Sequence, residues 1–300
     1  MTTPTRESAR QFELIGVPFD GAATLGWPGS RYAPAKIREA LSWMTMREED
    51  GLVYSLQTGD LHSAGPDRLT DAGDVDVVPH DLMATLDAAS EAVARTVAAG
   101  RVPILLGGDD SLLFAGVRGL HDAVQGSVGV IHFDAHLDLM DHNRRQGTHS
   151  QSSGMRRSLE LERVHYSRCV QVGLRHFNFP SSREFLRREG PAQITAPEFH
   201  RIGTDEAVRR ILERVSGADH VFFSFDIDAV DPAYAPGAGA HEPGGLTSAQ
   251  ALEAVRQLAP YCDGFAVTEV NPLKDHADMT SNLAAYLCYY FAVFGSQPAA

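Results

Sequence analysis

The sequence is poor in cysteine, has no long apolar run and carries no excess of positive charge. Its three cysteines, Cys169, Cys262 and Cys288, are scattered and lack metal-site spacing, which favours a reducing compartment. No uninterrupted apolar run is long enough to cross a bilayer, and residues 1–11 are polar rather than signal-like. We therefore expect a cytoplasmic protein without a membrane partner.

The charge balance argues against a nucleic-acid partner. The formal net charge is −13, whereas nucleic-acid-binding surfaces are normally basic. This balance is compatible with a cationic small-molecule substrate, although surface acids more often serve solubility. With 43% hydrophobic and 22% charged residues, the 300-residue chain has an ordinary globular composition. Because it shows no internal repeat and no linker-like run, we expect one domain over residues 1–300.

Short apolar segments alternate with segments of helical periodicity along most of the chain. The expected strands cover residues 12–17, 102–106, 128–133, 170–174, 221–226 and 264–270, and a further short strand borders the turn at 71–77. The expected helices cover residues 35–41, 80–99, 112–120, 182–188, 204–215, 247–258 and 282–291. This alternation predicts an α/β fold with a mainly parallel sheet covered on both faces, and such sheets bind ligands at the carboxyl ends of their strands.

Two of the expected strands end in clusters of acidic residues. Asp134, His136 and Asp138 follow the apolar run that ends at residue 133, and Asp226 and Asp228 follow the strand over 221–226. Clustered carboxylates repel one another unless a cation lies between them, and oxygen ligands with an imidazole suit manganese. The alternative is that these are ordinary acids in strand-end loops. The presence of two clusters favours a metal site.

The order of several motifs resembles the ureohydrolase family, which includes arginase, agmatinase and guanidinobutyrase, and the match is with the agmatinase-like branch. The matching segments are Gly16–Asp20 with Pro28–Pro34, Asp71–Asp74, Gly107–Ser111, Asp134–Asp138, and Ser224–Asp228 continuing to Glu242–Gly245. The resemblance implies hydrolysis of a guanidino compound to urea and an amine at a site with two Mn²⁺ ions per chain. It also implies an arginase-like three-layer α/β/α fold and a homo-oligomer, a trimer or hexamer.

The resemblance also implies roles for individual residues. The implied metal ligands are Asp134, His136, Asp138, Asp226 and Asp228, of which Asp134 and Asp226 would bridge the two ions. Two metals that share a water lower its pKa, and the resulting metal-bound hydroxide would attack the guanidinium carbon. Glu269 matches the family's guanidinium-binding glutamate, because a carboxylate can accept paired hydrogen bonds from that planar group. The alternative for Glu269 is a strand-end acid that bonds to nearby backbone.

The loop over residues 141–153 carries further candidates. In the family a histidine on this loop helps to protonate the departing amine, and we prefer His149 to His142 because His142 lies close to Asp138 in sequence. Arg144 and Arg145 precede His149, and their guanidinium groups would suit a substrate carboxylate, which would favour a guanidino acid over agmatine. For all three residues the alternative is a solvated position on a polar loop.

Three positions depart from the family pattern. Asp110 stands where the first motif normally has a metal-binding histidine, which leaves open a modified two-metal site, a weakened or vacant position, or a different divalent metal. His241 lies in a segment, residues 237–241, where relatives carry Gly-Thr-Gly-Thr-Pro, and it would either contact substrate or merely pack. Met140 replaces the asparagine with which arginases read the α-carboxylate of their substrate, so arginase activity is not expected.

We therefore expect a metal-dependent amidinohydrolase that acts on agmatine or on a guanidino acid such as guanidinobutyrate. One alternative is a specialised C–N hydrolase for a modified guanidino intermediate of secondary metabolism. Another is a non-catalytic member of the family that binds a ligand or a partner subunit, although unpaired buried acids would then carry a large electrostatic cost. Metal content and urea release distinguish these possibilities.

Overall fold

The computed structural model describes residues 10–23 and 25–296. Thr24 of the expected first loop, and the polar segment before Arg10, lie outside the described residues. The main-sheet strands are β1 (Gln11–Gly16), β4 (Leu69–Asp74), β5 (Arg101–Leu106), β6 (Val128–Phe133), β7 (Val164–Leu174), β8 (Ala192–Thr195), β9 (His220–Asp226) and β10 (Gly264–Thr268). Their order across the eight-stranded sheet is β4-β1-β5-β10-β9-β6-β7-β8, and every neighbouring pair is parallel.

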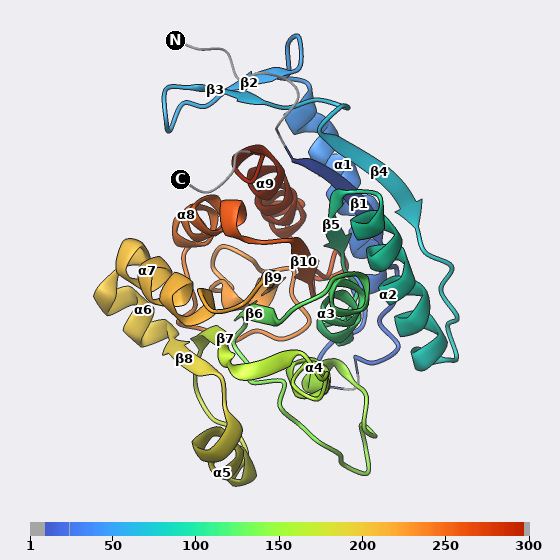
Figure 1. Ribbon diagram of the computed structural model, residues 1–300, viewed down its shortest axis with the longest axis vertical. Helices are drawn as coiled ribbons and strands as arrows, with labels where there is room; N and C mark the ends of the chain where they lie inside the picture. Colours follow the sequence, from blue (N-terminus) through green and yellow to red (C-terminus); the bar gives the residue numbers. More distant parts are fainter. Residues whose placement is uncertain (1–9, 24, 297–300) are drawn as a thin grey trace.

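Helices cover both faces of this sheet (Figure 1). One face carries α1 (Ala33–Thr45), α6 (Ala196–Ile202), α7 (Thr204–Val215), α8 (Ser248–Leu258) and α9 (Met279–Phe294). The other face carries α2 (Leu82–Ala98), α3 (Ser111–Ala123) and α4 (Gly154–Ser158). Short 3-10 helices are η1 (Ser30–Tyr32), η2 (Gln151–Ser153), η3 (Ile227–Ala229) and η4 (Ala259–Tyr261). The predicted parallel sheet between two helical layers is confirmed.

Local sequence signals explain where several helices begin and end. The Asp81 side chain accepts a hydrogen bond from the backbone N–H of Ala84 and so caps the start of α2, and Gly100, at φ 75°, follows its end. A reciprocal pair of bonds between Thr247 and Gln250 caps α8. These signals position helices whose apolar faces then pack on the sheet.

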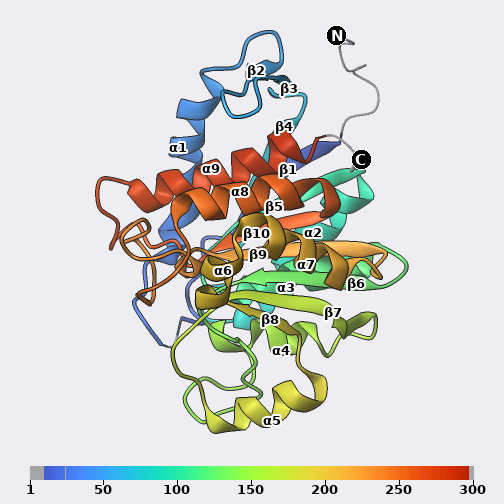
Figure 2. The same ribbon diagram turned by 90° about the vertical axis from the view of Figure 1, so that its left-hand side faces the viewer.

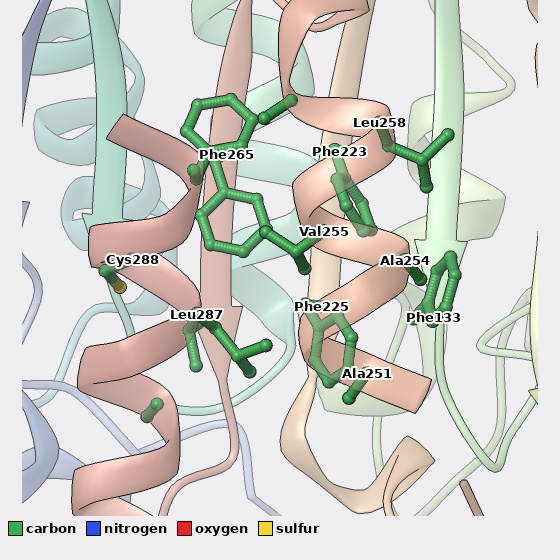
Figure 3. Packing of buried hydrophobic residues seen from close by; sticks show 14 of the residues in the cluster. Phe133, Phe223, Phe225, Ala251, Ala254, Val255, Leu258, Phe265, Leu287 and Cys288 are labelled. Carbon is green, nitrogen blue, oxygen red and sulfur yellow. The ribbon is translucent and has the colours of Figure 1, made fainter. Parts of the chain in front are cut away.

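Aromatic side chains dominate the core beneath α8 and α9. Figure 3 shows Phe133, Phe223 and Phe225 under α8, with Phe265 beside α9. Phe265 stacks on Phe291 with ring centroids 4.5 Å apart. Each fully buried ring of this kind contributes about 1.5–3 kcal/mol relative to exposure. This cluster makes the central strands a rigid base for the residues at their carboxyl ends.

The structure differs from the sequence expectations in elements that lack apolar periodicity. Strands β2 (Leu52–Tyr54) and β3 (Leu61–Ser63) form a separate antiparallel pair, which Figure 2 shows at one end of the molecule. Strand β7 begins at Val164 rather than at residue 170. Most of its first residues are polar and partly exposed, so they lack the apolar pattern that predicted the strand over 170–174. Helix α5 (Pro180–Glu189) buries no residue and projects from the far end (Figure 2). Among the described helices, none has the length and apolarity needed to cross a bilayer.

Candidate metal centre

Four adjacent strands bring the acidic motifs together at one edge of the sheet. Asp110 follows β5, Asp134 follows β6, Asp226 ends β9 and Glu269 follows β10. The strands are in register there, because Phe133 pairs with Phe225 and Thr268 pairs with Asp226. A cavity of about 800 Å³ opens at this edge. Its lining includes Asp110, His136, Asp138, Asp226, Asp228 and Glu269.

Two groups of side chains bring potential ligand atoms within 4.8 Å of one another. The first group, called here the first metal position, consists of Asp110, His132, Asp134 and Asp138. The second group, the second metal position, consists of Asp134, His136 and Asp228. Asp134 belongs to both groups, which suits a bridging ligand. Asp226 belongs to neither, and one of its carboxylate oxygens accepts a hydrogen bond from the backbone N–H of Asp228 at 2.8 Å.

The second metal position is held by ion pairs and backbone hydrogen bonds. His136 Nδ1 lies 3.2 Å from Asp134 Oδ1 and 3.1 Å from Asp228 Oδ2. The charge of Asp228 raises the pKa of His136 well above its usual range, although burial opposes this. Burial also disfavours an ionised Asp228, but His136 and the backbone N–H of Ala135 outweigh burial and lower the pKa of Asp228. The carboxylate is thus kept ionised.

The first metal position is more deeply buried and has polar atoms without partners. Asp110 Oδ1 accepts a hydrogen bond from the Thr268 hydroxyl at 2.6 Å. Asp110 Oδ2, His132 Nε2 and Asp134 Oδ2 are buried, and no described residue forms a regular hydrogen bond with them. His132 Nε2 lies 3.1 Å from Asp134 Oδ2 and 3.5 Å from Asp110 Oδ2.

Sequence reasoning missed His132, although a signal was present. It stands two residues before Asp134, and alternate residues of a strand point to the same face. Burial opposes a charged His132, but Asp110 and Asp134 outweigh burial and raise its pKa to about 10. His132 therefore belongs to the electrostatic environment of the first metal position.

The donor set fits a divalent cation. Burial raises the pKa of Asp138, Asp226 and Glu269 well above their usual ranges, which shows how unfavourable these charges are without a positive partner. The unpartnered oxygens of Asp110 and Asp134 face the same small region. Carboxylate oxygens with an imidazole match Mn²⁺ better than a metal that prefers thiolates.

The turn after β5 is fixed by Asp109 and by close backbone packing. Asp109 accepts hydrogen bonds from the backbone N–H of Ser111 and from that of Ala22. A Cβ added at Gly108 would lie 1.7 Å from the carbonyl oxygen of Phe19, so only glycine fits there. Asp109 thus ties the first loop to this turn, while Asp110 faces the cavity.

Glu269 lies in the cavity wall directly after β10. Its backbone has φ 60°, a left-handed conformation that is uncommon outside glycine and often found at functional sites. Glu269 Oε1 accepts a hydrogen bond from the backbone N–H of Asp110 at 2.9 Å, and a Cβ added at Gly239 would lie 2.4 Å from Oε2. Glu269 is therefore firmly positioned, and its role toward a guanidinium stays a prediction.

Four of the sequence-based candidates are not among the residues that line the cavity. His149 packs against Phe114 with ring centroids 5.9 Å apart, because the loop turns back onto α3. Arg144 and Arg145 are exposed at the tip of the same loop. His241 is exposed, and its Nε2 lies 2.6 Å from the carbonyl oxygen of Pro236. Their expected roles toward a substrate stay predictions.

Other side chains line the cavity in their place. His142 does so, whereas the preferred His149 does not. Gln151 also faces the cavity, and its Oε1 is buried without a hydrogen-bond partner among the described residues. Arg156 is the only arginine or lysine among the described lining residues. Its guanidinium lies 4.4 Å from the ring centroid of Phe185, and its backbone N–H donates to the carbonyl oxygen of Asp138 at 3.0 Å.

Comparisons with known proteins agree with this geometry. The model of the arginase family matches residues 10–293. Proclavaminate amidinohydrolase of Streptomyces clavuligerus is 34% identical over 296 residues, which cover 93% of this chain and 87% of that protein. Guanidinopropionase of Pseudomonas aeruginosa is 34% identical over 287 residues, which cover 95% of this chain and 86% of that protein. The crystal structure of formimidoylglutamase from Bacillus subtilis superposes with a TM-score of 0.85 at 27% identity, covering 99% of this chain and 90% of that one.

Proposed function

The chain belongs to the arginase family and is a hydrolase of amidino C–N bonds, and we propose that its substrate is a small guanidino acid, which it cleaves to urea and an amino acid. One observation carries this proposal. Acidic groups of both metal positions, Asp110, Asp138 and Asp228, line the same cavity as Arg156, the only arginine or lysine among the described lining residues. The acids suit the metal and the guanidinium, and Arg156 suits a carboxylate at the substrate's other end.

Two divalent cations, Mn²⁺ by the preference of the donor set, would be held at the two metal positions. The residues that would hold them are Asp110, Asp134, His136, Asp138 and Asp228, with Asp226 adjacent. When bound, such ions supply Lewis acidity that makes water nucleophilic near neutral pH. Asp134, common to both groups, would contribute to holding both ions.

Glu269 would orient the guanidinium. Its carboxylate lines the cavity and is anchored through the Asp110 backbone, so it offers acceptors to the paired N–H groups of the substrate. Burial raises the pKa of Glu269, and a guanidinium beside it would favour the ionised form again. Binding of the cationic group and ionisation of this carboxylate therefore support each other.

His142 is the better placed candidate for protonating the departing amine. It lines the cavity from the loop after β6, whereas His149 packs on Phe114 outside the lining. Histidine side chains commonly serve as general acids and bases in catalysis. We therefore assign this role to His142 in place of His149.

Arg156 distinguishes a guanidino acid from agmatine. Its Nε donates to Glu160 at 3.2 Å and its guanidinium packs on Phe185, so the side chain is preorganised at the cavity wall. A substrate carboxylate would gain a charge-assisted hydrogen bond there, whereas the terminal ammonium of agmatine would meet a like charge. Guanidinopropionase, one of the relatives described above, is named for a guanidino acid.

Two other functions keep support from particular observations. The similarity to proclavaminate amidinohydrolase supports a larger guanidino acid of secondary metabolism. The superposition on formimidoylglutamase supports a formimidoyl amino acid, whose hydrolysis would release formamide instead of urea. A non-catalytic role is disfavoured by the number of buried acids that lack a positive partner. Assembly into a homo-oligomer and a cytoplasmic location stay predictions.

A substrate panel with matched arginine variants tests the proposal. Purified Mn²⁺-loaded protein is assayed for urea with guanidinopropionate, guanidinobutyrate and agmatine, and for formamide with formimidoylglutamate. We expect urea from a guanidino acid, and we expect Arg156→Gln to lower kcat/KM for it by about 10–100-fold, the value of a hydrogen bond to a charged group. The control Arg145→Gln, on the exposed loop, should change it little. Agmatine as the preferred substrate, unaffected by Arg156→Gln, would contradict the proposal.

A further inference from the structure

His132 lies near the carboxyl end of β6, between the metal positions and a polar residue of the neighbouring strand β7. It is fully buried in β6, where it pairs in register with Gln171 of β7. Its Nε2 faces Asp134 Oδ2 at 3.1 Å and Asp110 Oδ2 at 3.5 Å. Its Nδ1 faces the side-chain nitrogen of Gln171 at 3.2 Å. The two ring nitrogens therefore meet different chemical groups.

Gln171 determines which ring nitrogen carries a proton. Its side-chain nitrogen donates to the carbonyl oxygen of Leu137 at 2.7 Å, which fixes the orientation of the amide, since the reverse orientation would set two oxygens against each other. The second hydrogen of the same NH₂ group is then available to Nδ1 of His132. Because Nδ1 accepts this hydrogen, the ring in this arrangement is neutral and carries its proton on Nε2. The raised pKa of His132 comes from the negative charges of Asp110 and Asp134, which a bound cation would offset.

We propose that His132 is a positioning residue whose Nε2–H lies between the carboxylates of Asp110 and Asp134 and holds both in place, and that it is not itself a metal ligand. The inference rests on the proposed function, in which these carboxylates bind cations. The hydrogen points between two acceptors, which accounts for the absence of a well-aligned bond to either one. Shared donors of this kind are common in proteins.

This arrangement explains how an aspartate can serve where the family resemblance leads one to expect a histidine. Asp110 Oδ1 accepts from the Thr268 hydroxyl, and Oδ2 faces His132. With the Thr268 hydroxyl on Oδ1 and the His132 N–H facing Oδ2, the Asp110 carboxylate is oriented and can offer its remaining lone pairs to a cation. The additional negative charge that Asp110 brings is partly offset by the N–H dipole of His132. Groups that orient metal ligands in this way typically affect metal affinity by about 10–100-fold.

The contrary assignment, His132 as a ligand through Nε2, conflicts with Gln171. A coordinating nitrogen has no proton, so the proton would move to Nδ1 and point at the NH₂ group of Gln171. Two donors would then face each other at a fully buried site. Metal-binding histidines normally donate their other N–H to an acceptor, and the group within reach of Nδ1 is a donor.

The protonation of His132 tests the inference directly. In protein labelled with nitrogen-15 at histidine, the ring nitrogens report whether each carries a proton, and the His132 signals are identified by their loss in His132→Asn. We expect Nε2 of His132 to carry a proton both without metal and after loading with diamagnetic Zn²⁺. A Zn²⁺-loaded protein with a proton on Nδ1 and a metal-shifted Nε2 would overturn the inference.

A second measurement follows Mn²⁺ binding in matched variants by electron paramagnetic resonance of the free ion. We expect His132→Phe, which removes the donor, to weaken one of the two Mn²⁺ ions by about 10–100-fold and the other much less. His132→Asn, which keeps a donor but is a poor ligand, should recover part of that loss. His220→Asn, at the start of β9 outside the cavity, is the control and should bind Mn²⁺ like the wild type.

The two measurements separate this inference from the proposed function. If the wild type binds Mn²⁺ and His132→Phe binds it equally well, the inference fails while the function stands. If the wild type binds no Mn²⁺ although Nε2 carries a proton, the proposed function fails while the hydrogen-bond assignment stands. Should His132→Phe fail to fold, the nitrogen-15 measurement on the wild type decides by itself.

Discussion

The two metal positions share Asp134 but differ in how the protein prepares them. At the second position His136 and Asp228 pair with each other, and the His136 side chain is 38% exposed. At the first position His132 is fully buried, and Asp110, His132 and Asp134 each have an atom without a regular hydrogen bond. The second position is thus arranged by ion pairs within the protein, whereas the first has buried oxygens that a cation would satisfy. The first position is also the one that departs from the family pattern, at Asp110.

The largest effect should come from the residue that the two positions share. Asp134→Asn removes a negative charge from both positions, so we expect both ions to be lost. Hydrolysis should fall by at least about 10⁴-fold, as when a member of a catalytic unit is removed. Metal content and product release on the same sample check this. Retention of one tightly bound ion would show that the positions are less dependent on each other than the geometry indicates.

Removing the metal should make stability fall as pH rises. Burial raises the pKa of Asp109 from 3.8 to about 7, and it also raises the pKa values of Asp138, Asp226 and Glu269. For such acids the folded state holds protons that the unfolded state has released, so their stabilising contribution is complete below 3.8 and is lost as pH rises through about 7. The pKa of Asp228 is lowered, so its contribution to stability has the opposite pH dependence: it is present near neutral pH and is lost as the pH falls.

The corresponding experiment measures thermal unfolding with chelator and with Mn²⁺ across this pH range. We expect the transition temperature with chelator to fall between about pH 5 and pH 8. At a hundredfold excess over Kd, Mn²⁺ should add about 3 kcal/mol of stability, and more at higher pH, because cations compete with protons for these carboxylates. Parallel curves with and without metal would contradict this expectation.

Restoring an imidazole should reduce the difference between the two positions. Asp110→His removes the extra negative charge and supplies the ligand type that the family resemblance implies. We expect the affinity of the first position for Mn²⁺ to change by about 10-fold, toward tighter binding, because the new imidazole does not depend on His132 for its orientation. For the same reason, His132→Asn should lower the Mn²⁺ affinity of the first position less in the Asp110→His variant than in the wild type. If His132→Asn lowered the Mn²⁺ affinity equally in the wild type and in the Asp110→His variant, His132 would not act through Asp110.

The smallest effects should come from polar residues outside the cavity. Single substitutions of Arg144, Arg145, His149 and His241 should each leave kcat/KM within about 2-fold, as expected for surface changes away from a site.

By contrast, His142→Asn should lower kcat by about 10²-fold or more, the usual contribution of a proton-transfer group. If His149→Asn were the more damaging of the two histidine variants, the position of this loop during catalysis would differ from the one described above.

Parts of the site followed from the sequence because short-range geometry determines them. Asp134, His136 and Asp138 were predictable as a cluster, since they continue a buried strand at alternate positions. His132 obeys the same alternation, but it looked like part of the apolar strand, and its role depends on Gln171 in a neighbouring strand. That contact is tertiary and leaves no pattern in the local sequence.

The loop over residues 141–153 shows where local reasoning ends. Sequence spacing favoured His149 over His142, which lies close to Asp138, whereas the path of the loop brings His142 to the cavity lining. That path depends on the Asn143–Gly147 bridge and on packing against α3, neither of which is encoded by periodicity. Arg156 was overlooked for a related reason. It reaches the cavity through packing on Phe185, which lies in α5, far along the chain.

The most direct test of the unequal positions is a titration of the metal-free wild-type protein with Mn²⁺, with bound ion counted per chain. We expect two ions per chain that bind in two steps, with the weaker step being the one that His132→Phe weakens further. Two results would contradict the difference between the two positions. One is a single bound ion per chain, and the other is two ions of equal affinity that His132→Phe leaves unchanged.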